Sequence, residues 1–205
     1  MHLAEFGEID IYLFDQLLKG RIGPDDRVLD AGCGSGRNLV YLLRSGVDVS
    51  AADTNPHAIA EVRELAREHA PGLSGDRFRI EAIERLSFPD SAFTVVICNA
   101  VLHFAAGDEP FDAMIAGLWR VLAPGGMLFA RLATTIGMET RVRPLGNRRF
   151  LLPDGTERYL ADEAMLVERT ARLGGQLLDP IKTTVVQDQR SMTTWVVRKG
   201  SARRP

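Results

Sequence analysis

A glycine-rich turn is the part of the sequence with the most specific chemistry. Residues 28–38 read VLDAGCGSGRN, so a short apolar run delivers Asp30 into a turn that contains Gly32, Gly34 and Gly36. Glycine lets a backbone bend sharply and approach a ligand closely, and a helix that starts after such a turn offers unpaired N–H groups. We therefore interpret this segment as a ligand-binding turn, and a purely structural strand-to-helix turn is the less favoured alternative.

A second acidic residue lies where open α/β folds bind ribose. Asp53 ends the next apolar run, and an acid about 20 residues beyond such a turn hydrogen-bonds ribose hydroxyls. A dinucleotide site requires GxGxxG, but Arg37 stands at the third glycine position. The carboxylate of Asp30 would also repel a pyrophosphate, whereas it can reach the ammonium of an amino-acid ligand directly or through water. Both features argue against a dinucleotide.

The elements that would position these residues alternate along the chain. Short apolar runs predict strands at residues 28–29, 47–52, 77–80, 93–98 and 127–132, and helical patterns lie between them at 37–45, 56–70 and 110–122. Such alternation implies right-handed crossovers and a parallel sheet with helices on both faces. The order predicts an α/β, Rossmann-like, doubly wound fold.

The pattern changes after residue 135. Asp154-Gly155 between two short apolar runs predicts a hairpin, and residues 162–173 have the pattern of a capped amphipathic helix. Two further β-type runs, 177–186 and 193–197, lack a helix-length connection, so we expect them to pair antiparallel. A further helical pattern at residues 8–20 precedes the first strand.

Composition narrows the class of protein. The 205 residues, 45% of them hydrophobic, are enough for one core, so we expect a single domain over 1–205. The net charge of -2 gives no support to nucleic-acid binding, and no apolar run is long enough to span a membrane. Cys33 and Cys98 lack metal-ligand spacing, so we expect no metal, and reduced thiols fit a cytoplasmic location. The oligomeric state stays open.

Four segments, in order, resemble the class I methyltransferases that use S-adenosylmethionine (SAM). They are VLDAGCGSG, VSAADTNPHAI, IERLSFPDSAFTVVICNAVLHF and LWRVLAPGGMLFARL, and the likeness covers nearly all of residues 25–199. The resemblance implies a mostly parallel seven-stranded sheet whose final strand is antiparallel. It also implies SAM as cofactor and S-adenosylhomocysteine as product.

The resemblance assigns cofactor contacts residue by residue. Those positions are Asp30, Gly32, Cys33, Gly34, Gly36, Asn38, Asp53, Thr54, Ala82, Ile83 and Asn99. One departure is visible, because the family often has an acid for the adenine amino group where this chain has Ala82. Adenine contact must then come from the backbone around Ile83, or from Glu81 or Glu84.

The resemblance also directs attention to an acceptor site beside the fourth strand. His103 is the candidate catalytic base because imidazole titrates near neutrality, whereas a cap or a loop hydrogen bond is the more common role of such a histidine. Candidate substrate contacts are Tyr12, His103, Phe104, Arg148 and Arg149. The last two belong to the segment RVRPLGNRR at residues 141–149, which contains four arginines. Arginine forks suit carboxylate, phosphate or oxyanion groups, although a solvated basic loop is the commoner reason for such a run. We expect residues 1–24 to form a helical lid and residues 136–160 an insert that shapes the acceptor pocket.

These features predict methyl transfer from SAM to a small molecule, and the arginines favour an anionic one. The residues also allow a non-catalytic SAM-binding module, or a methyltransferase acting on protein or RNA. The run Gly36-Arg37-Asn38 is similar to the tellurite-resistance methyltransferase branch. Three residues within a shared motif do not define the acceptor.

Overall fold

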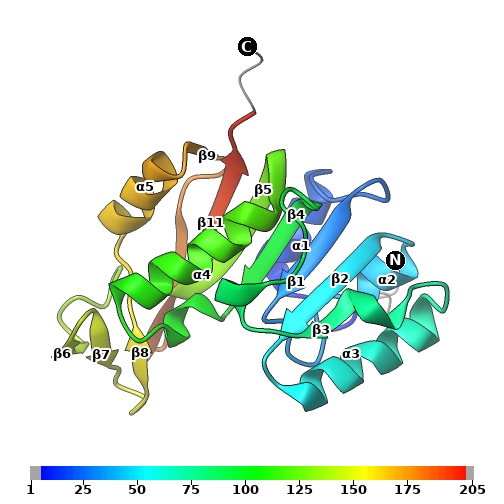
Figure 1. The fold of residues 1–205 in the computed structure, drawn as a ribbon. Coiled ribbons are helices and arrows are strands. Elements are labelled where there is room, and N and C mark those ends of the chain that lie inside the picture. Colours follow the sequence, from blue (N-terminus) through cyan, green and yellow to red (C-terminus); the bar gives the residue numbers. More distant parts are fainter. Residues whose placement is uncertain (1–5, 202–205) are drawn as a thin grey trace.

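The computed structural model describes residues 6–201, and its centre is a twisted sheet with helices on both faces (Figure 1). The main strand order is β10-β11-β5-β4-β1-β2-β3, and the short β9 also pairs with β11. The bounds are β1 Arg27–Ala31, β2 Asp48–Asp53, β3 Phe78–Ile80, β4 Phe93–Asn99, β5 Leu122–Ala133, β9 Gly175–Leu177, β10 Lys182–Val186 and β11 Arg190–Lys199.

The pairing pattern confirms the predicted fold class. β1 pairs in parallel with β2 and β4, β2 with β3, and β4 with β5. The final strand β11 lies between β5 and β10 and runs antiparallel to both. Most residues of β4 are buried, as expected for a parallel strand covered on both faces.

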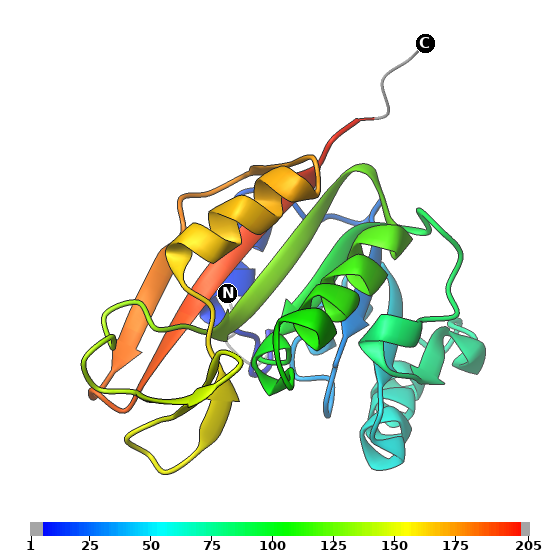
Figure 2. The same cartoon turned by 60° about the vertical axis from the view of Figure 1, so that its left-hand side comes forward.

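Helices divide the core into two layers, one on each face of the sheet. α4 (Asp108–Val121) and α5 (Glu163–Arg172) pack on one face, and Figure 2 shows them side by side in front of the strands. α1 (Ile11–Leu18), α2 (Val40–Arg44) and α3 (Pro56–His69) cover the other face. Three single-turn 3₁₀ helices are η2 (Gly75–Arg77), η3 (Ile83–Arg85) and η4 (Leu102–Phe104). Within residues 6–201, no helix has the length and apolar character needed to cross a bilayer.

The segment after β5 forms a small antiparallel sheet of its own. Its strands are β6 (Arg143–Gly146), β7 (Arg149–Leu151) and β8 (Glu157–Tyr159), and Asp154-Gly155 turns between the last two, as predicted. The Tyr159 side chain anchors this sheet, because its hydroxyl donates to Asp108 Oδ1 at 2.6 Å and its ring stacks on Phe111 at 4.8 Å. The insert therefore sits against the start of α4.

Three of the differences between predicted and observed boundaries have a clear physical reason. The run 177–186 forms two strands, β9 and β10, interrupted around Pro180, a residue that has no N–H to donate to a ladder. The helix predicted over 37–45 is only α2, because residues before Val40 continue the glycine turn. β5 begins at Leu122, earlier than predicted, because Leu122 already pairs with Phe93 before a register shift.

Candidate functional site

A cavity of about 580 Å³ opens at the carboxyl ends of β1, β2 and β4. Ligands of open α/β sheets bind at this edge, and the volume is within the range of small-molecule sites. Most predicted cofactor contacts line it, namely Gly32, Cys33, Gly34, Asn38, Asp53, Thr54, Ala82, Ile83 and Asn99, together with Phe104 from the predicted substrate set. Two predicted contacts, Asp30 and Gly36, are not part of this lining.

The glycine turn is shaped by close backbone packing at Gly32. This residue has φ +80°, and a Cβ there would overlap the side chain of Val101. Its N–H and that of Cys33 both donate to the carbonyl of Ala52, at 2.7 and 3.2 Å. Because only glycine adopts this geometry without strain, the turn stays narrow and its backbone faces the cavity.

Asp53 ties the second strand to the glycine turn. Its Oδ2 accepts the N–H of Gly34 and its Oδ1 accepts the N–H of Asn55, both at 2.9 Å. A carboxylate has further lone pairs after two such bonds. Asp53 can therefore hold the turn and accept ligand hydroxyls at the same time.

Two buried polar side chains beside the turn have no partner among the described residues. Both carboxylate oxygens of Asp30 and both amide atoms of Asn99 lack a hydrogen bond. Burial raises the pKa of Asp30 to about 7, against an opposing effect of Arg37 and with a smaller contribution from Asp53. Buried polar groups are nearly always paired in proteins, so the arrangement fits a ligand that supplies donors here.

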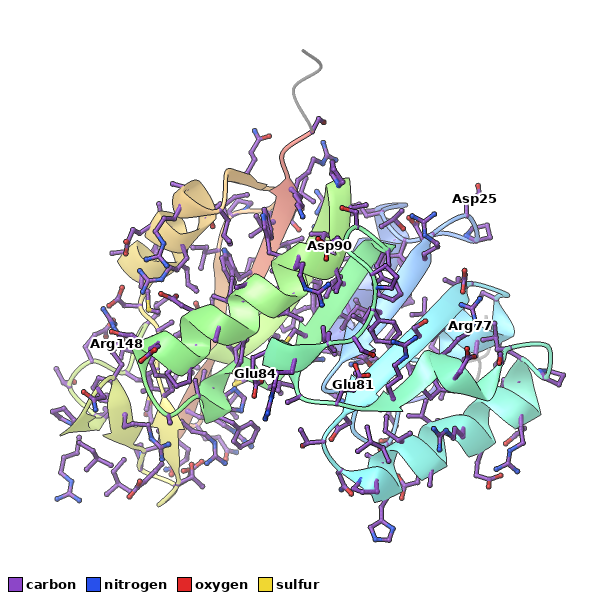
Figure 3. All side chains as sticks on the ribbon, in the orientation of Figure 1. Asp25, Arg77, Glu81, Glu84, Asp90 and Arg148 are labelled. Carbon is purple, nitrogen blue, oxygen red and sulfur yellow. The ribbon has the colours of Figure 1, made fainter. Side chains whose placement is uncertain are left out.

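The far end of the cavity is formed by residues 81–84, where the family pattern lacks its acid. Glu81 directly follows β3 and Glu84 lies in η3, nearer to α4, and both line the cavity (Figure 3). The carboxylate of Glu81 already accepts the N–H and the hydroxyl of Ser87. Glu81 is therefore held in place by its own loop, and Ala82 and Ile83 present a less polar wall between the two acids.

A second cavity, of about 350 Å³, adjoins the first. Ala100, just after β4, lines both cavities, and its N–H donates to the carbonyl of Arg131 at 2.7 Å. The rest of the lining comes from η4, β5, the insert and the β10–β11 hairpin: His103, Arg131, Ala133, Leu152, Asp154, Thr156, Arg158, Val186, Arg190 and Met192.

His103 lies in this second cavity, but its hydrogen bonding does not suit a base. Its Nδ1 accepts the N–H of Ala133 at 3.2 Å, so the hydrogen of the neutral ring sits on Nε2. Burial, with a smaller effect of the Arg158 charge, lowers the pKa of His103 to about 4. At neutral pH the imidazole is therefore an N–H donor, and the structure favours the loop hydrogen bond over the predicted base role.

The structure places Arg148 and Arg149 outside both cavities. Arg148 pairs with Asp162 at 2.8 Å and with Asp108 at 3.5 Å, beside the start of α4 (Figure 3). Arg149 pairs with Glu157 across the insert at 3.3 Å. Arg148 thus connects the insert to α4 and α5, and Arg149 pairs within the insert. The expectation that they face the acceptor does not match these positions.

Three other arginines occupy the place expected for Arg148 and Arg149. Arg131, Arg158 and Arg190 line the second cavity, although they are separated by long stretches of sequence. Arg131 lies on β5 two residues before Ala133, whose N–H bonds His103. Its place near the end of a predicted strand could have marked Arg131 as a cavity residue from the sequence alone. No sequence pattern indicates that Arg158 and Arg190 line the same cavity.

Tyr12 lines neither cavity in the described structure. Its hydroxyl meets that of Thr184, and the guanidinium of Arg131 lies 5.0 Å from its ring centre. Asp10, which caps α1 through the N–H of Tyr12, pairs with Arg131 at 3.1 Å and with Arg37 at 3.6 Å. The start of α1 is therefore bonded to one arginine of each cavity, but Tyr12 covers neither cavity. The lid role of residues 1–24 stays a prediction, and residues 1–5 lie outside the described part.

Comparison with known proteins places this geometry in a family. The methyltransferase domain family matches residues 29–130. A ubiquinone biosynthesis O-methyltransferase of Methylocella silvestris is 40% identical over 106 residues, which are 51% of this chain and 38% of that protein. The chain spans about half or less of the length of several curated relatives that it matches.

Two solved structures share the fold at low identity. A SAM-dependent methyltransferase of Methanosarcina mazei has a TM-score of 0.69 at 21% identity, covering 91% of this chain and 98% of that one. The 1,6-didemethyltoxoflavin-N1-methyltransferase of Burkholderia thailandensis, with its acceptor and S-adenosylhomocysteine bound, has a TM-score of 0.67 at 20% identity, covering 92% and 76%. The chain belongs to the class I SAM-dependent methyltransferases.

The residues of the first cavity fit SAM. The turn at Gly32 is open to close approach, and Asp53 has lone pairs for ribose hydroxyls. Asp30, which lies buried behind the lining, is a carboxylate without a hydrogen-bond partner among the described residues that could balance an ammonium group. The wall at Ala82 and Ile83 suits the flat face of adenine.

Proposed function

We propose that this chain transfers a methyl group from SAM to a small-molecule acceptor bound in the second cavity. The observation that best supports this proposal is that Ala100 lines both cavities, so the two cavities meet at this residue, which we call the junction. A methyl donor in the first cavity and an acceptor in the second would meet there. The acceptor must be small, because the second cavity measures only about 350 Å³.

When bound, SAM supplies an electrophilic methyl group whose transfer to an acceptor lone pair leaves the sulfur as a neutral thioether. The chain's task is then alignment, since a well-oriented pair of reactants gains most of its rate from positioning. Asp53 and the glycine turn orient the donor. His103 orients the acceptor by donating from Nε2, because its Nδ1 is occupied by Ala133.

The lining of the second cavity supports an anionic acceptor. An anion needs no base to become nucleophilic, in line with a neutral His103 and with the arginines around it. The net charge of -2 gives no support to RNA as acceptor, and we propose a metabolite rather than a macromolecule.

Isothermal calorimetry and a product assay test the proposal together. We expect SAM and S-adenosylhomocysteine to bind with micromolar affinity, about -7 to -8 kcal/mol. We also expect S-adenosylhomocysteine to accumulate when the protein meets SAM and a pool of small organic acids. Binding without turnover in any pool would favour a non-catalytic SAM-binding module, and absence of binding at millimolar SAM would refute the proposal.

A further inference from the structure

We propose that the second cavity is a monocarboxylate subsite, in which Arg158 and Arg190 bind the anionic group of the methyl acceptor. This inference rests on the proposed function, since it defines the substrate class of the same site. It replaces Arg148 and Arg149, which point elsewhere, with two arginines that the fold brings together from the insert and the β10–β11 hairpin.

Arg158 is held in place without an ion pair. Its Nη1 donates to the carbonyl of Glu157 at 2.7 Å, and its guanidinium lies 4.9 Å from the ring centre of Phe104. Phe104 lines the first cavity, whereas Arg158 lines the second. The charge of Arg158 is therefore fixed close to the junction where transfer would occur, and it also reaches His103, whose pKa it lowers.

Arg190 supplies the second charge from another part of the lining. It begins β11, directly after the turn at Gln187 and Asp188, both with positive φ. Within the described part of the chain, neither Arg158 nor Arg190 forms an ion pair. Guanidinium groups that lack a carboxylate partner can receive one from a ligand, in a planar geometry that matches carboxylate oxygens.

The charges of the side chains that line the second cavity favour a ligand with a single negative charge. Asp154 shares the cavity, and its pKa is lowered chiefly by two hydrogen bonds from Thr156, then by Arg190 and Arg158. Arg131 is already paired with Asp10 at 3.1 Å. The two arginines without an ion pair therefore face one carboxylate, and one positive charge remains for the ligand. A dianionic phosphate would leave an excess of negative charge, so a carboxylate is the better match.

Ligand-detected NMR with three probes tests this subsite at saturating S-adenosylhomocysteine, which occupies the first cavity. The probes are benzoate, its neutral analogue benzamide, and the dianion phenyl phosphate. We expect benzoate to bind at least tenfold more tightly than either of the others. Equal binding of benzamide, tighter binding of phenyl phosphate, or no binding of benzoate would overturn the inference.

Matched variants connect the binding to the residues. R158Q with R190Q should weaken benzoate at least tenfold, and each single variant should have a smaller effect. The control pair R148Q with R149Q removes the same number of arginines from outside the cavity and should leave benzoate affinity unchanged. An unaffected R158Q/R190Q protein, or an equal loss in the control, would contradict the subsite.

Cofactor affinity separates the two proposals. SAM binding, measured by calorimetry, should change less than twofold in R158Q/R190Q, and this readout also shows that the variant is folded. If the wild-type protein binds benzoate but never forms S-adenosylhomocysteine, the subsite stands and the proposed methyl transfer fails. If SAM binds and turns over while benzoate does not bind, the subsite fails alone.

Discussion

Among single residues, Asp30 has the clearest electrostatic role. Its carboxylate is buried, has no partner among the described residues, and has a pKa raised to about 7 by burial. A ligand ammonium would reverse this by stabilising the charged form. The residue therefore weakens the ligand-free fold as its carboxyl ionises, which is the trade between stability and function that we would expect of the proposed ammonium contact.

We predict that Asp30→Asn removes this pH dependence. The folded pKa of about 7 exceeds the unfolded value of 3.8, so the wild-type contribution is present at low pH and is lost as pH rises to 7. The free energy of unfolding of the wild type should fall by about 3 kcal/mol from pH 5 to pH 8, whereas that of the variant should lack this decrease. Urea unfolding at both pH values measures this. SAM affinity should fall at least tenfold in the same variant, and unchanged affinity would refute the ammonium contact.

His103 gives the opposite pH slope. Its folded pKa of about 4 is lower than the ordinary value of 6.5, so stability is complete above pH 6.5 and is lost as pH falls to 4. The whole effect is about 3 kcal/mol. His103→Gln should abolish it while keeping a side-chain N–H donor, and turnover should fall less than tenfold. A loss of more than a hundredfold, with a titration near pH 6.5 in the wild-type rate, would restore the general-base role.

Asp53 has a structural role beside the ribose contact that we propose for it. Asp53→Ala removes a carboxylate whose bonds to ribose hydroxyls are worth about 1.5–3 kcal/mol, so SAM affinity should fall more than tenfold. The variant also leaves the N–H groups of Gly34 and Asn55 without their acceptor. Asp53→Asn, which retains one acceptor oxygen, is the control and should lose less affinity in the same calorimetric titration.

At the scale of elements, α5 depends on the residue that also anchors the insert. Asp162 caps α5 by accepting the N–H of Met165 and receives Arg148, both at 2.8 Å. Asp162→Ala should lower the free energy of unfolding by about 1 kcal/mol, the usual effect of losing an N-cap. Asp162→Ser keeps the cap and should lose less. SAM affinity should stay the same in both, since Asp162 lines neither cavity, and a large change would show that the insert reaches the cofactor.

For the whole molecule, cofactor binding should appear as stability. The first cavity exists only in the folded chain. A ligand that binds there therefore stabilises the folded state through mass action. At a SAM concentration of 100 times Kd the gain is about 2.7 kcal/mol, which corresponds to a rise in Tm of about 5–10 °C for a chain of this size. Differential scanning fluorimetry measures the shift. Adenosine alone should give a smaller shift, because it lacks the ammonium that Asp30 would bind.

The assembled molecule also decides which charges act together. Arg131, Arg158 and Arg190 come from β5, β8 and β11, and only the packing of the insert and the last hairpin beside β5 places them around one cavity. Arg148 instead pairs with carboxylates at the starts of α4 and α5, and Arg149 pairs with Glu157 within the insert. The location in the cytoplasm stays a prediction at this scale.

Local patterns in the sequence determined the fold class, the glycine turn and the position of Asp53. These depend on backbone conformations and on residues within one strand–turn–helix unit, so periodicity and spacing are sufficient to predict them. The hairpin at Asp154-Gly155 and the cap at Asp162 were predictable for the same reason.

Only the tertiary structure determined which residues line the second cavity, where we propose that the acceptor binds. Whether an arginine faces a cavity or a carboxylate depends on neighbours distant in sequence, and four clustered arginines in one loop gave a misleading local signal. The same applies to His103, whose hydrogen position follows from the N–H of Ala133 on another strand. The burial of Asp30 likewise comes from packing, and this burial is the main cause of its raised pKa.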